Sequence, residues 1–237
     1  EHIIVDNCST DTTLELIRSE YSKAQRSNQL KIICEKDHGI SDAFNKGILA
    51  ATGDVIHILN GDDQYAESNS LARVMRAFEE PSVDLVHGSI IFDDPTYGSQ
   101  VRKPLNCPVT DAMPFQHPAT FVRRRIYDQY GLFDLSYRYA MDYEWVMRLY
   151  SAPRRCRISI QEIPGPALSR MFGGGVSAKH ELRALNECAT ALRKNSLAAW
   201  RATLQLKLRR LRCIVKNYLP EPLRKLAVSR WRNAKWR

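Results

Sequence analysis

The sequence lacks the long apolar runs and paired cysteines that mark membrane-spanning and zinc-binding proteins. No stretch approaches the roughly 18 consecutive apolar residues of a transmembrane helix. The six cysteines are irregularly spaced and include no CxxC pair, which favours reduced cytosolic thiols over a zinc site or a disulfide framework. No internal repeat or low-complexity tract interrupts the chain, so we expect one sizeable core with an appendage.

The chain also has few acids at one end and no signal segment at the other. It opens on the apolar run HIIVD without an initiator methionine, so we expect further residues to precede Glu1. Residues 193–237 hold fourteen lysines and arginines but only one acid, a net charge of +13, whereas residues 1–192 carry −4. This asymmetry predicts two regions with different partners.

Short apolar segments alternate with amphipathic helical patterns through the first ninety or so residues. We expect strands at 2–6, 30–35, 53–59 and 83–92, with helices at 11–26, 41–51 and 68–80. This alternation predicts an α/β fold with a mostly parallel sheet and flanking helices, and the β-branched strands predict burial on both faces.

The second half of the chain is less regular. Four prolines between 96 and 118 predict a long loop, followed by a short strand, a helix and a turn within 117–134. A helix over 142–150, a last strand over 156–163 and a flexible glycine loop over 172–180 come next. We therefore divide the chain into a catalytic domain, 1–178, and a basic helical extension, 179–237.

Polar residues follow two of the predicted strands where they end. Asp6 and Asn7 follow the first strand, and the run from Asn60 to Asp63 follows the third. In open α/β sheets ligands bind beyond the carboxyl ends of the strands. Asp62 or Asp63 could hold Mg²⁺ or Mn²⁺, which bind one or two carboxylates and complete their shells with phosphate and water. The alternative is a turn in which Asn60 and Asp63 bond their own backbone.

A second polar group lies on the helix predicted over 41–51. Asp42, Asn45 and Lys46 share one helical face, and the preceding Gly39 allows close approach of an anion to the helix start. The alternative is a solvated polar face.

Two further residues could take part in catalysis. Asp142, at a helix start, could be a general base or only a cap. His117, after the proline-rich segment, could contact a ligand or only fill space. Glu144 and Arg148, four residues apart, are expected to form a surface pair.

Taken in order, five segments resemble the successive blocks of glycosyltransferase family 2. They are IIVDNCSTDTT, GISDAFNKGILAATGDVIHILNGDD, HPATFVRRRIYDQYGLFD, AMDYEWVMRL and FGGGVS, and they cover about residues 1–178. The similarity is strongest to bacterial enzymes that build cell-envelope polysaccharides. It implies a GT-A fold, a Rossmann-like sheet that binds a nucleotide-sugar, and an inverting reaction in one displacement step.

The resemblance also implies a role for each candidate residue. Asp6, with Asn7 beside it, would contact the nucleotide base, and Asp42 and Lys46 would line the nucleotide pocket. Asn60 and Asp62 would stand at the D-x-D motif. The remaining roles are Asp62 as the main ligand of the divalent cation, Asp63 beside it, Asp142 as the base and His117 as a substrate contact.

Two departures from the family pattern bear on these roles. Asn60 replaces the first acid of the D-x-D motif and is a weaker metal ligand. The family's first strand and the helix after it do not occur in these 237 residues, and the pocket would lack one edge if nothing precedes Glu1. Both departures allow an alternative function, a non-catalytic protein that only binds a nucleotide-sugar.

The basic tail predicts a membrane contact. Leu204, Leu208, Leu211 and Val215 recur at helical spacing among lysines and arginines, and two prolines precede a second helix that includes Leu226 and Trp231. Such helices are typical of anionic membrane surfaces. Nucleic-acid binding and simple packing on the catalytic domain are the weaker alternatives. We expect a UDP- or GDP-sugar donor, a saccharide or lipid-linked acceptor, and a cytoplasmic protein peripheral to the inner face of the membrane.

Overall fold

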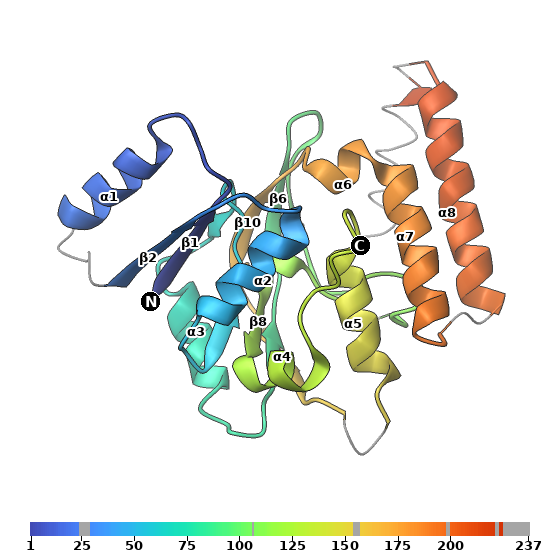
Figure 1. Ribbon diagram of the computed structural model, residues 1–237. Coiled ribbons are helices and arrows are strands. Elements are labelled where there is room, and N and C mark those ends of the chain that lie inside the picture. The colour runs from blue at the N-terminus through green and yellow to red at the C-terminus, as the bar shows by residue number, and fades with distance from the viewer. Residues whose placement is uncertain (24–28, 106, 154–156, 198–199, 221–222, 225–237) are drawn as a thin grey trace.

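The computed structural model describes residues 1–23, 29–105, 107–153, 157–197, 200–220 and 223–224. Its strands form a central layer with helices α2, α3, α4 and α5 around it, and α7 and α8 stack beyond α5 at one side (Figure 1). This arrangement confirms the α/β fold class.

The first half alternates strands and helices as far as α3, as predicted, but β4 was not expected and β7 lies in the segment that was expected to be a loop. Its elements are β1 (His2–Asp6), α1 (Thr13–Lys23), β2 (Leu30–Cys34), α2 (Ile40–Ala50), β3 (Val55–His57), β4 (Gln64–Tyr65), α3 (Ser70–Ala77), β5 (Leu85–His87), β6 (Ile90–Asp94) and β7 (Gly98–Arg102).

The second half is richer in helix. Its elements are the 3₁₀ turn η2 (His117–Ala119), β8 (Thr120–Arg123), α4 (Arg124–Tyr130), α5 (Met141–Ser151), β9 (Ile160–Glu162), β10 (Ser169–Phe172), α6 (Val176–Lys179), α7 (Glu181–Lys194) and α8 (Trp200–Tyr218). The glycine loop expected over 172–180 thus contains the short helix α6, and β10 was not expected.

The strands form mixed sheets, so the expectation of a mostly parallel arrangement is corrected. Their orders are β1-β2, β4-β10-β6-β7 and β3-β8-β5-β9. β8 runs antiparallel to both of its neighbours, and its first residues pair with His57 and His87, the last residues of β3 and β5. The proline-containing segment before β8 therefore brings the chain to the carboxyl ends of β3 and β5. From there β8 runs between these two strands in the opposite direction.

The single strand expected over 83–92 is two strands in different sheets. Gly88 lies between β5 and β6, where a Cβ atom would come within 2.7 Å of the Leu168 side chain. Only glycine fits so close a contact without displacing Leu168, so the chain changes sheets at this residue.

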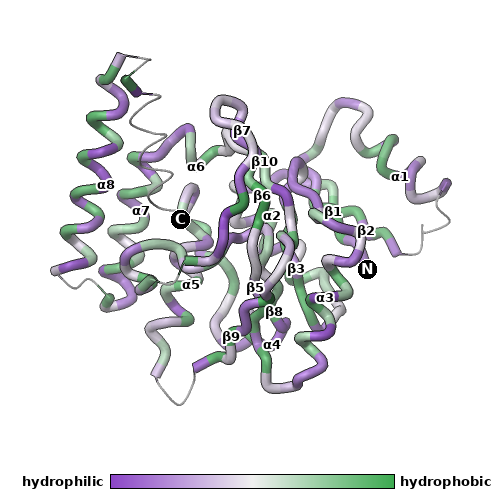
Figure 2. Tube along the Cα trace, turned by 180° about the vertical axis from the view of Figure 1, so that it is seen from behind, coloured by the Kyte–Doolittle hydropathy of each residue, from purple (hydrophilic) through white to green (hydrophobic). Residues whose placement is uncertain are grey.

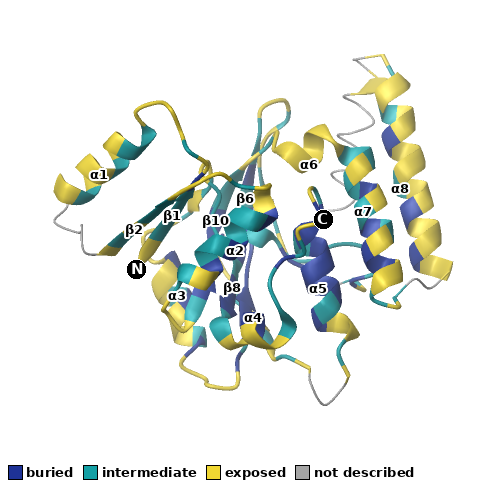
Figure 3. Cartoon of the chain, viewed as in Figure 1, coloured by how far each residue is buried: buried dark blue, intermediate teal, exposed yellow. Residues whose placement is uncertain are grey.

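The core extends into the helices that follow residue 178. Trp145 and Met147 of α5 share one buried cluster with Leu185 and Ala191 of α7 and Leu206 of α8. Figure 3 shows α5 mostly buried, whereas α1 and α8 are largely exposed. The domain boundary at 178 stays a prediction, but α7 packs on α5 as part of the same core.

The basic segment after α7 forms one long helix, α8, within the described residues. Hydrophobic and hydrophilic residues alternate along α8 (Figure 2). No helix in the described part of the chain is both long and apolar enough to cross a membrane. Of the second tail helix, expected to include Leu223, Leu226 and Trp231, only Leu223 and Arg224 are described, and both are helical.

Candidate functional site

Asp6 lies buried at the carboxyl end of β1. Its carboxylate accepts hydrogen bonds from the hydroxyl and the backbone N–H of Ser9, and these hold the pKa of Asp6 below its usual range. The side-chain oxygen of Asn7 accepts the backbone N–H of Asp37 at 2.8 Å. The two residues therefore fix the loops that follow β1 and β2.

Lys46 on α2 forms the centre of an ion-pair cluster beside these loops. Its ammonium lies 2.7 Å from Asp37, 3.2 Å from Glu35 and 3.3 Å from Asp42. The bond to Asp37 is the main cause that raises the pKa of Lys46. The backbone N–H of His38 donates to Asp42 at 2.9 Å and lowers the pKa of that carboxyl. The structure thus brings Asp42 and Lys46 together, as expected.

The third residue of that helical face serves a different purpose. Asn45 is buried, and its amide exchanges two hydrogen bonds with the backbone of Phe133, at 2.8 and 2.9 Å. Nearby, the Ser41 hydroxyl donates to the Tyr137 carbonyl at 2.8 Å. These contacts dock α2 on the loop that leads into α5.

Asn60 and Asp63 close a turn after β3. The Asp63 N–H donates to the Asn60 carbonyl, and the Asn60 amide donates to the Asp63 carboxylate, both at 3.0 Å. Burial raises the pKa of Asp63. Asp62 is exposed and makes no hydrogen bond to the described residues. The turn therefore presents Asp62 outward while Asp63 braces it.

This donor set fits a divalent cation that takes most of its ligands from phosphate and water. The described residues contain no group of three or more His, Cys, Asp or Glu side chains that could hold a metal ion on their own. A hard cation such as Mg²⁺ needs only one or two protein carboxylates when a diphosphate supplies further oxygens. Asp62 can supply one, with Asn60 or Asp63 beside it.

His57, at the end of β3, connects this turn to η2. Its Nδ1 lies 3.0 Å from the Tyr65 hydroxyl, and its Nε2 lies 3.0 Å from the Pro118 carbonyl. Burial lowers the pKa of His57 to about 4, so its ring is uncharged at neutral pH. His57 was not predicted as a site residue, although a histidine within an apolar strand is a signal that could have identified it.

His117 and Asp142 lie together at a cavity beyond β3 and β8. The cavity is lined by Ile58, His117 and Asp142, with aromatic and aliphatic side chains completing its wall. The His117 ring stacks on Phe44 of α2, with 5.2 Å between ring centroids. Burial lowers the pKa of His117, and the nearby Asp142 carboxylate opposes this shift.

Asp142 belongs to the first turn of α5 but is not its N-cap. Ala140 occupies the N-cap position, and no side-chain hydrogen bond from that residue caps the helix. The Asp142 carboxylate accepts the N–H of its neighbour Tyr143 at 2.7 Å. The Asp142 carboxylate therefore satisfies one N–H group of the first turn of α5, although it is not the N-cap residue.

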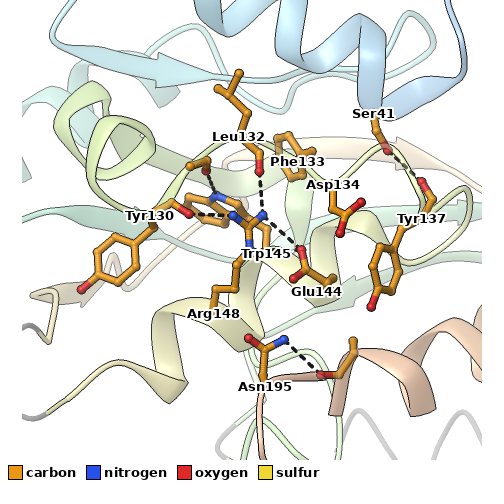
Figure 4. A network of polar contacts seen from close by, with 12 residues as sticks. Ser41, Tyr130, Leu132, Phe133, Asp134, Tyr137, Glu144, Trp145, Arg148 and Asn195 are labelled. Atoms are coloured by element: carbon orange, nitrogen blue, oxygen red, sulfur yellow. Dashed lines mark hydrogen bonds and ion pairs between the residues drawn. The ribbon is translucent and has the colours of Figure 1, made fainter. Parts of the chain in front are cut away.

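The rest of α5 is fixed by buried contacts, drawn in Figure 4. Arg148 donates to the carbonyls of Tyr130 and Leu132 at 2.6 and 2.7 Å, and it pairs with Glu144 at 3.0 Å. The Trp145 indole donates to the Gly131 carbonyl at 2.9 Å. Glu144 is fully buried, so the expectation of a surface pair with Arg148 was wrong. Tertiary packing encloses the pair because Arg148 reaches the turn after α4.

Comparisons with known proteins identify the family and the fold. The model of the family described as Glycosyl transferase family 2 matches residues 1–147. A PGL/p-HBAD biosynthesis glycosyltransferase of Mycobacterium bovis (strain BCG / Pasteur 1173P2) is 32% identical over 159 residues, which cover 65% of this chain and 59% of the relative. An uncharacterized glycosyltransferase of Nostoc sp. is 34% identical over 83 residues, covering 35% of this chain and 25% of that protein. The chain thus spans about three fifths of the length of the mycobacterial relative.

Two solved structures share the fold. S. aureus TarS in complex with UDP-GlcNAc superposes with a TM-score of 0.60 at 18% identity, covering 86% of this chain and 60% of that one. The mannosyltransferase PcManGT from Pyrobaculum calidifontis, in complex with GDP-Man and Mn²⁺, gives a TM-score of 0.56 at 15% identity, covering 98% and 70%. These likenesses show the GT-A fold that the sequence resemblance implied. With the family match over more than half of its residues, the chain belongs to glycosyl transferase family 2.

Proposed function

We propose that the chain transfers a sugar from a nucleotide-diphosphate donor to a hydroxyl of a saccharide or lipid-linked acceptor, with inversion at the sugar carbon. The observation that carries this proposal is the cavity shared by Ile58, His117 and Asp142. Ile58 lies two residues before the turn that presents Asp62, so the chain leads from this cavity to the proposed cation ligand, although none of the residues 60–63 lines the cavity itself.

The donor would bind along the carboxyl ends of β1, β2 and β3. Asp6, with Asn7 beside it, would contact the nucleotide base, and Asp42 and Lys46 would line the nucleotide pocket. A divalent cation bound at Asp62 would offset the negative charge that develops on the departing diphosphate. The structures that share the fold hold UDP-GlcNAc in one case and GDP-Man in the other, which supports a UDP- or GDP-sugar donor.

The acceptor would bind on the side of α5. A sugar hydroxyl is a poor nucleophile until a base removes its proton, and Asp142 is the carboxylate at this cavity. The uncharged His117 ring can donate or accept a hydrogen bond to a sugar hydroxyl beside it. One in-line displacement then inverts the anomeric carbon, with Asp142 on the face opposite the diphosphate and no covalent enzyme intermediate.

A panel of UDP- and GDP-sugars tests this proposal. The chain is mixed with each nucleotide-sugar and Mn²⁺ or Mg²⁺, with and without saccharide acceptors, and released nucleoside diphosphate is measured. We expect cation-dependent release with one donor and thermal stabilisation of the chain by the same donor. Stabilisation without release from any donor would favour the alternative, a protein that binds nucleotide-sugars without catalysis.

We further propose that α8 docks the protein on an anionic membrane at the cytoplasmic face. Its buried face consists of Ala202, Leu206 and Cys213. Its exposed face carries apolar side chains among cations, namely Trp200, Leu204, Leu208, Leu211 and Val215 with Lys207, Arg210 and Arg212. Apolar insertion and charge attraction together produce reversible binding in the plane of the interface.

Liposome co-sedimentation tests the membrane contact. Each lysine or arginine near an anionic surface contributes about 1 kcal/mol, so the triple change Lys207→Gln, Arg210→Gln and Arg212→Gln is expected to weaken binding about a hundredfold. The same change at three exposed cations outside the tail, Arg18, Arg76 and Lys103, is the matched control and is expected to have little effect. Equal binding to neutral vesicles would contradict the electrostatic part. Binding to RNA or DNA without binding to vesicles would favour a nucleic-acid partner.

A further inference from the structure

Glu187 of α7 accepts hydrogen bonds from three consecutive backbone N–H groups just before α5. Arg138 donates to one carboxylate oxygen at 3.0 Å, and Tyr139 and Ala140 donate to the other at 2.8 and 2.9 Å. We propose that Glu187 is a positioning residue that holds the α5 start and thereby sets the place of Asp142. This inference rests on the proposed role of Asp142 as the base.

The three bonds fix the backbone that leads directly into the first turn of α5. Hydrogen bonds to a carboxylate are shorter and roughly twice as strong as those between neutral groups. One carboxylate that accepts three successive N–H groups restrains the orientation of all three peptide planes. Asp142 follows Ala140 by two residues, so its carboxylate moves with these planes.

No local residue performs this task. A helix usually gains its first side-chain acceptor from its own N-cap residue, but the N-cap of α5 is Ala140, which has none to offer. Glu187 supplies the acceptor from 47 residues further along the chain. The restraint on the proposed base therefore comes from the helical region after residue 178.

Further contacts hold the same loop on both sides. The Ser177 hydroxyl donates to the Tyr139 carbonyl at 2.8 Å, and the Tyr139 ring lies 5.1 Å from the ring of His180. On the other side, Ser41 of α2 binds the Tyr137 carbonyl. The loop thus joins the C-terminal helices to the helix that carries Asp42 and Lys46, and Glu187 is the charged anchor among these contacts.

Glu187→Gln removes the charge and leaves a single acceptor oxygen for three donors. With Mn²⁺ and the UDP- or GDP-sugar that is turned over fastest, we expect kcat to fall roughly tenfold to a hundredfold, as a displacement of about 1 Å would cause. KM for the donor should stay within about twofold. Glu181→Gln is the matched control, because Glu181 lies on the same helix and pairs with Lys216 instead of the 138–140 loop. Its kcat should equal that of the wild type.

A double-mutant cycle separates positioning from general destabilisation. If Glu187 acts through Asp142, Glu187→Gln should lower kcat no further in an Asp142→Asn background, although it lowers the melting temperature there as well. Equal fold-losses of kcat in both backgrounds would overturn the inference. If Glu187→Gln does not fold, Glu187→Asp replaces it. This variant keeps the charge on a side chain that is shorter by one methylene, and we expect a smaller loss of kcat.

The two proposals fail in distinguishable ways. Normal turnover in Asp142→Asn would overturn the proposed base, and with it any action of Glu187 through that residue. Impaired turnover in Asp142→Asn combined with wild-type kcat in Glu187→Gln would overturn the positioning role alone.

Discussion

On the proposed donor side, Lys46 is held by the side chains of Asp37, Glu35 and Asp42, and Asp62 stands exposed in a turn. On the proposed acceptor side, α5 is held by bonds from buried side chains to backbone groups, and its Glu144 is wholly buried. The pairs of Lys46 with Asp37 and Asp42 are largely enclosed, with side chains 18%, 8% and 16% exposed, so the two sides do not differ simply in burial. They differ in the kind of contact, because charged side chains pair with one another on the donor side, whereas side chains bind backbone carbonyls on the acceptor side.

This difference suggests that the donor side serves ligand binding and that the acceptor side serves positioning of the base. Because Lys46 lies among three carboxylates, a negatively charged donor would have to replace one of these ion pairs to reach it. The base must instead keep one position relative to the sugar carbon, because small misplacements are costly in rate. Variants on the donor side should therefore lose ligand or cation binding. Variants on the acceptor side should lose kcat or stability.

The largest effect is expected from Asp62→Ala on the donor side. Asp62 makes no hydrogen bond to the described residues, so its removal should leave the melting temperature nearly unchanged. Turnover measured as nucleoside diphosphate release should fall below detection, because the cation loses its main protein ligand. Wild-type protein with excess chelator is the control for cation-independent release. Full activity of the variant under those conditions would reject the metal role.

Asp142→Asn tests the acceptor side and preserves the shape of the side chain. Turnover should fall about 10²- to 10⁴-fold, the usual effect of losing an acid–base group. Donor affinity, measured by thermal shift or calorimetry, should persist, because the nucleotide contacts lie elsewhere. A variant that no longer binds the donor would contradict the separation of donor binding from the acceptor side and would indicate a structural role for Asp142.

Local patterns in the sequence predicted the donor side better than the acceptor side. The first strand and the helix with Asp42 and Lys46 lie within about a residue of their expected ends, because strand and helix periodicity is encoded locally. The Asn60–Asp63 turn also follows from local chemistry, since both residues bond within four positions.

The acceptor side depends on contacts between distant segments. Glu144 and Arg148 have the spacing of a surface pair, but carbonyls of the turn after α4 draw Arg148 inward. β10 contains no β-branched residue, and it forms a strand because its backbone pairs with β4 on one side and with β6 on the other. The bond from Glu187 to the α5 start leaves no periodic signal, because 47 residues separate the partners. Such contacts depend on tertiary packing, which periodicity and propensity do not encode.

Arg148→Met measures how firmly the acceptor side is held. The change leaves the buried Glu144 charge without its partner, which costs about 3–5 kcal/mol, and it frees two carbonyls. We expect a clear fall in the melting temperature. Adding Glu144→Leu should recover much of the loss, since an apolar pair can replace a buried ion pair. Arg125→Met, which breaks a half-exposed pair with Asp84, is the control and should cost about 1 kcal/mol or less. Equal losses in both single variants would contradict the contrast between buried and exposed contacts.

The smallest effect is expected at Asp134, which ties the loop before α5 to the end of α7. Burial raises its pKa, but hydrogen bonds from Lys194 and Ser136 outweigh this and bring the pKa of Asp134 to about 2. Because the folded pKa lies below the value of 3.8 expected without these contacts, the stabilisation is present above about pH 4 and is lost as the pH falls toward 2.

Asp134→Asn should therefore lower stability by about 1 kcal/mol at pH 7, since the half-exposed Lys194 is screened by solvent. The difference from wild type should shrink as melting temperatures are recorded from pH 7 down to pH 3. Asp128→Asn is the matched control, because Asp128 is exposed and forms no hydrogen bond with the described residues. A stability difference that stays constant over this pH range would show that Asp134 acts by packing and that the ion pair adds nothing to the anchoring of the loop.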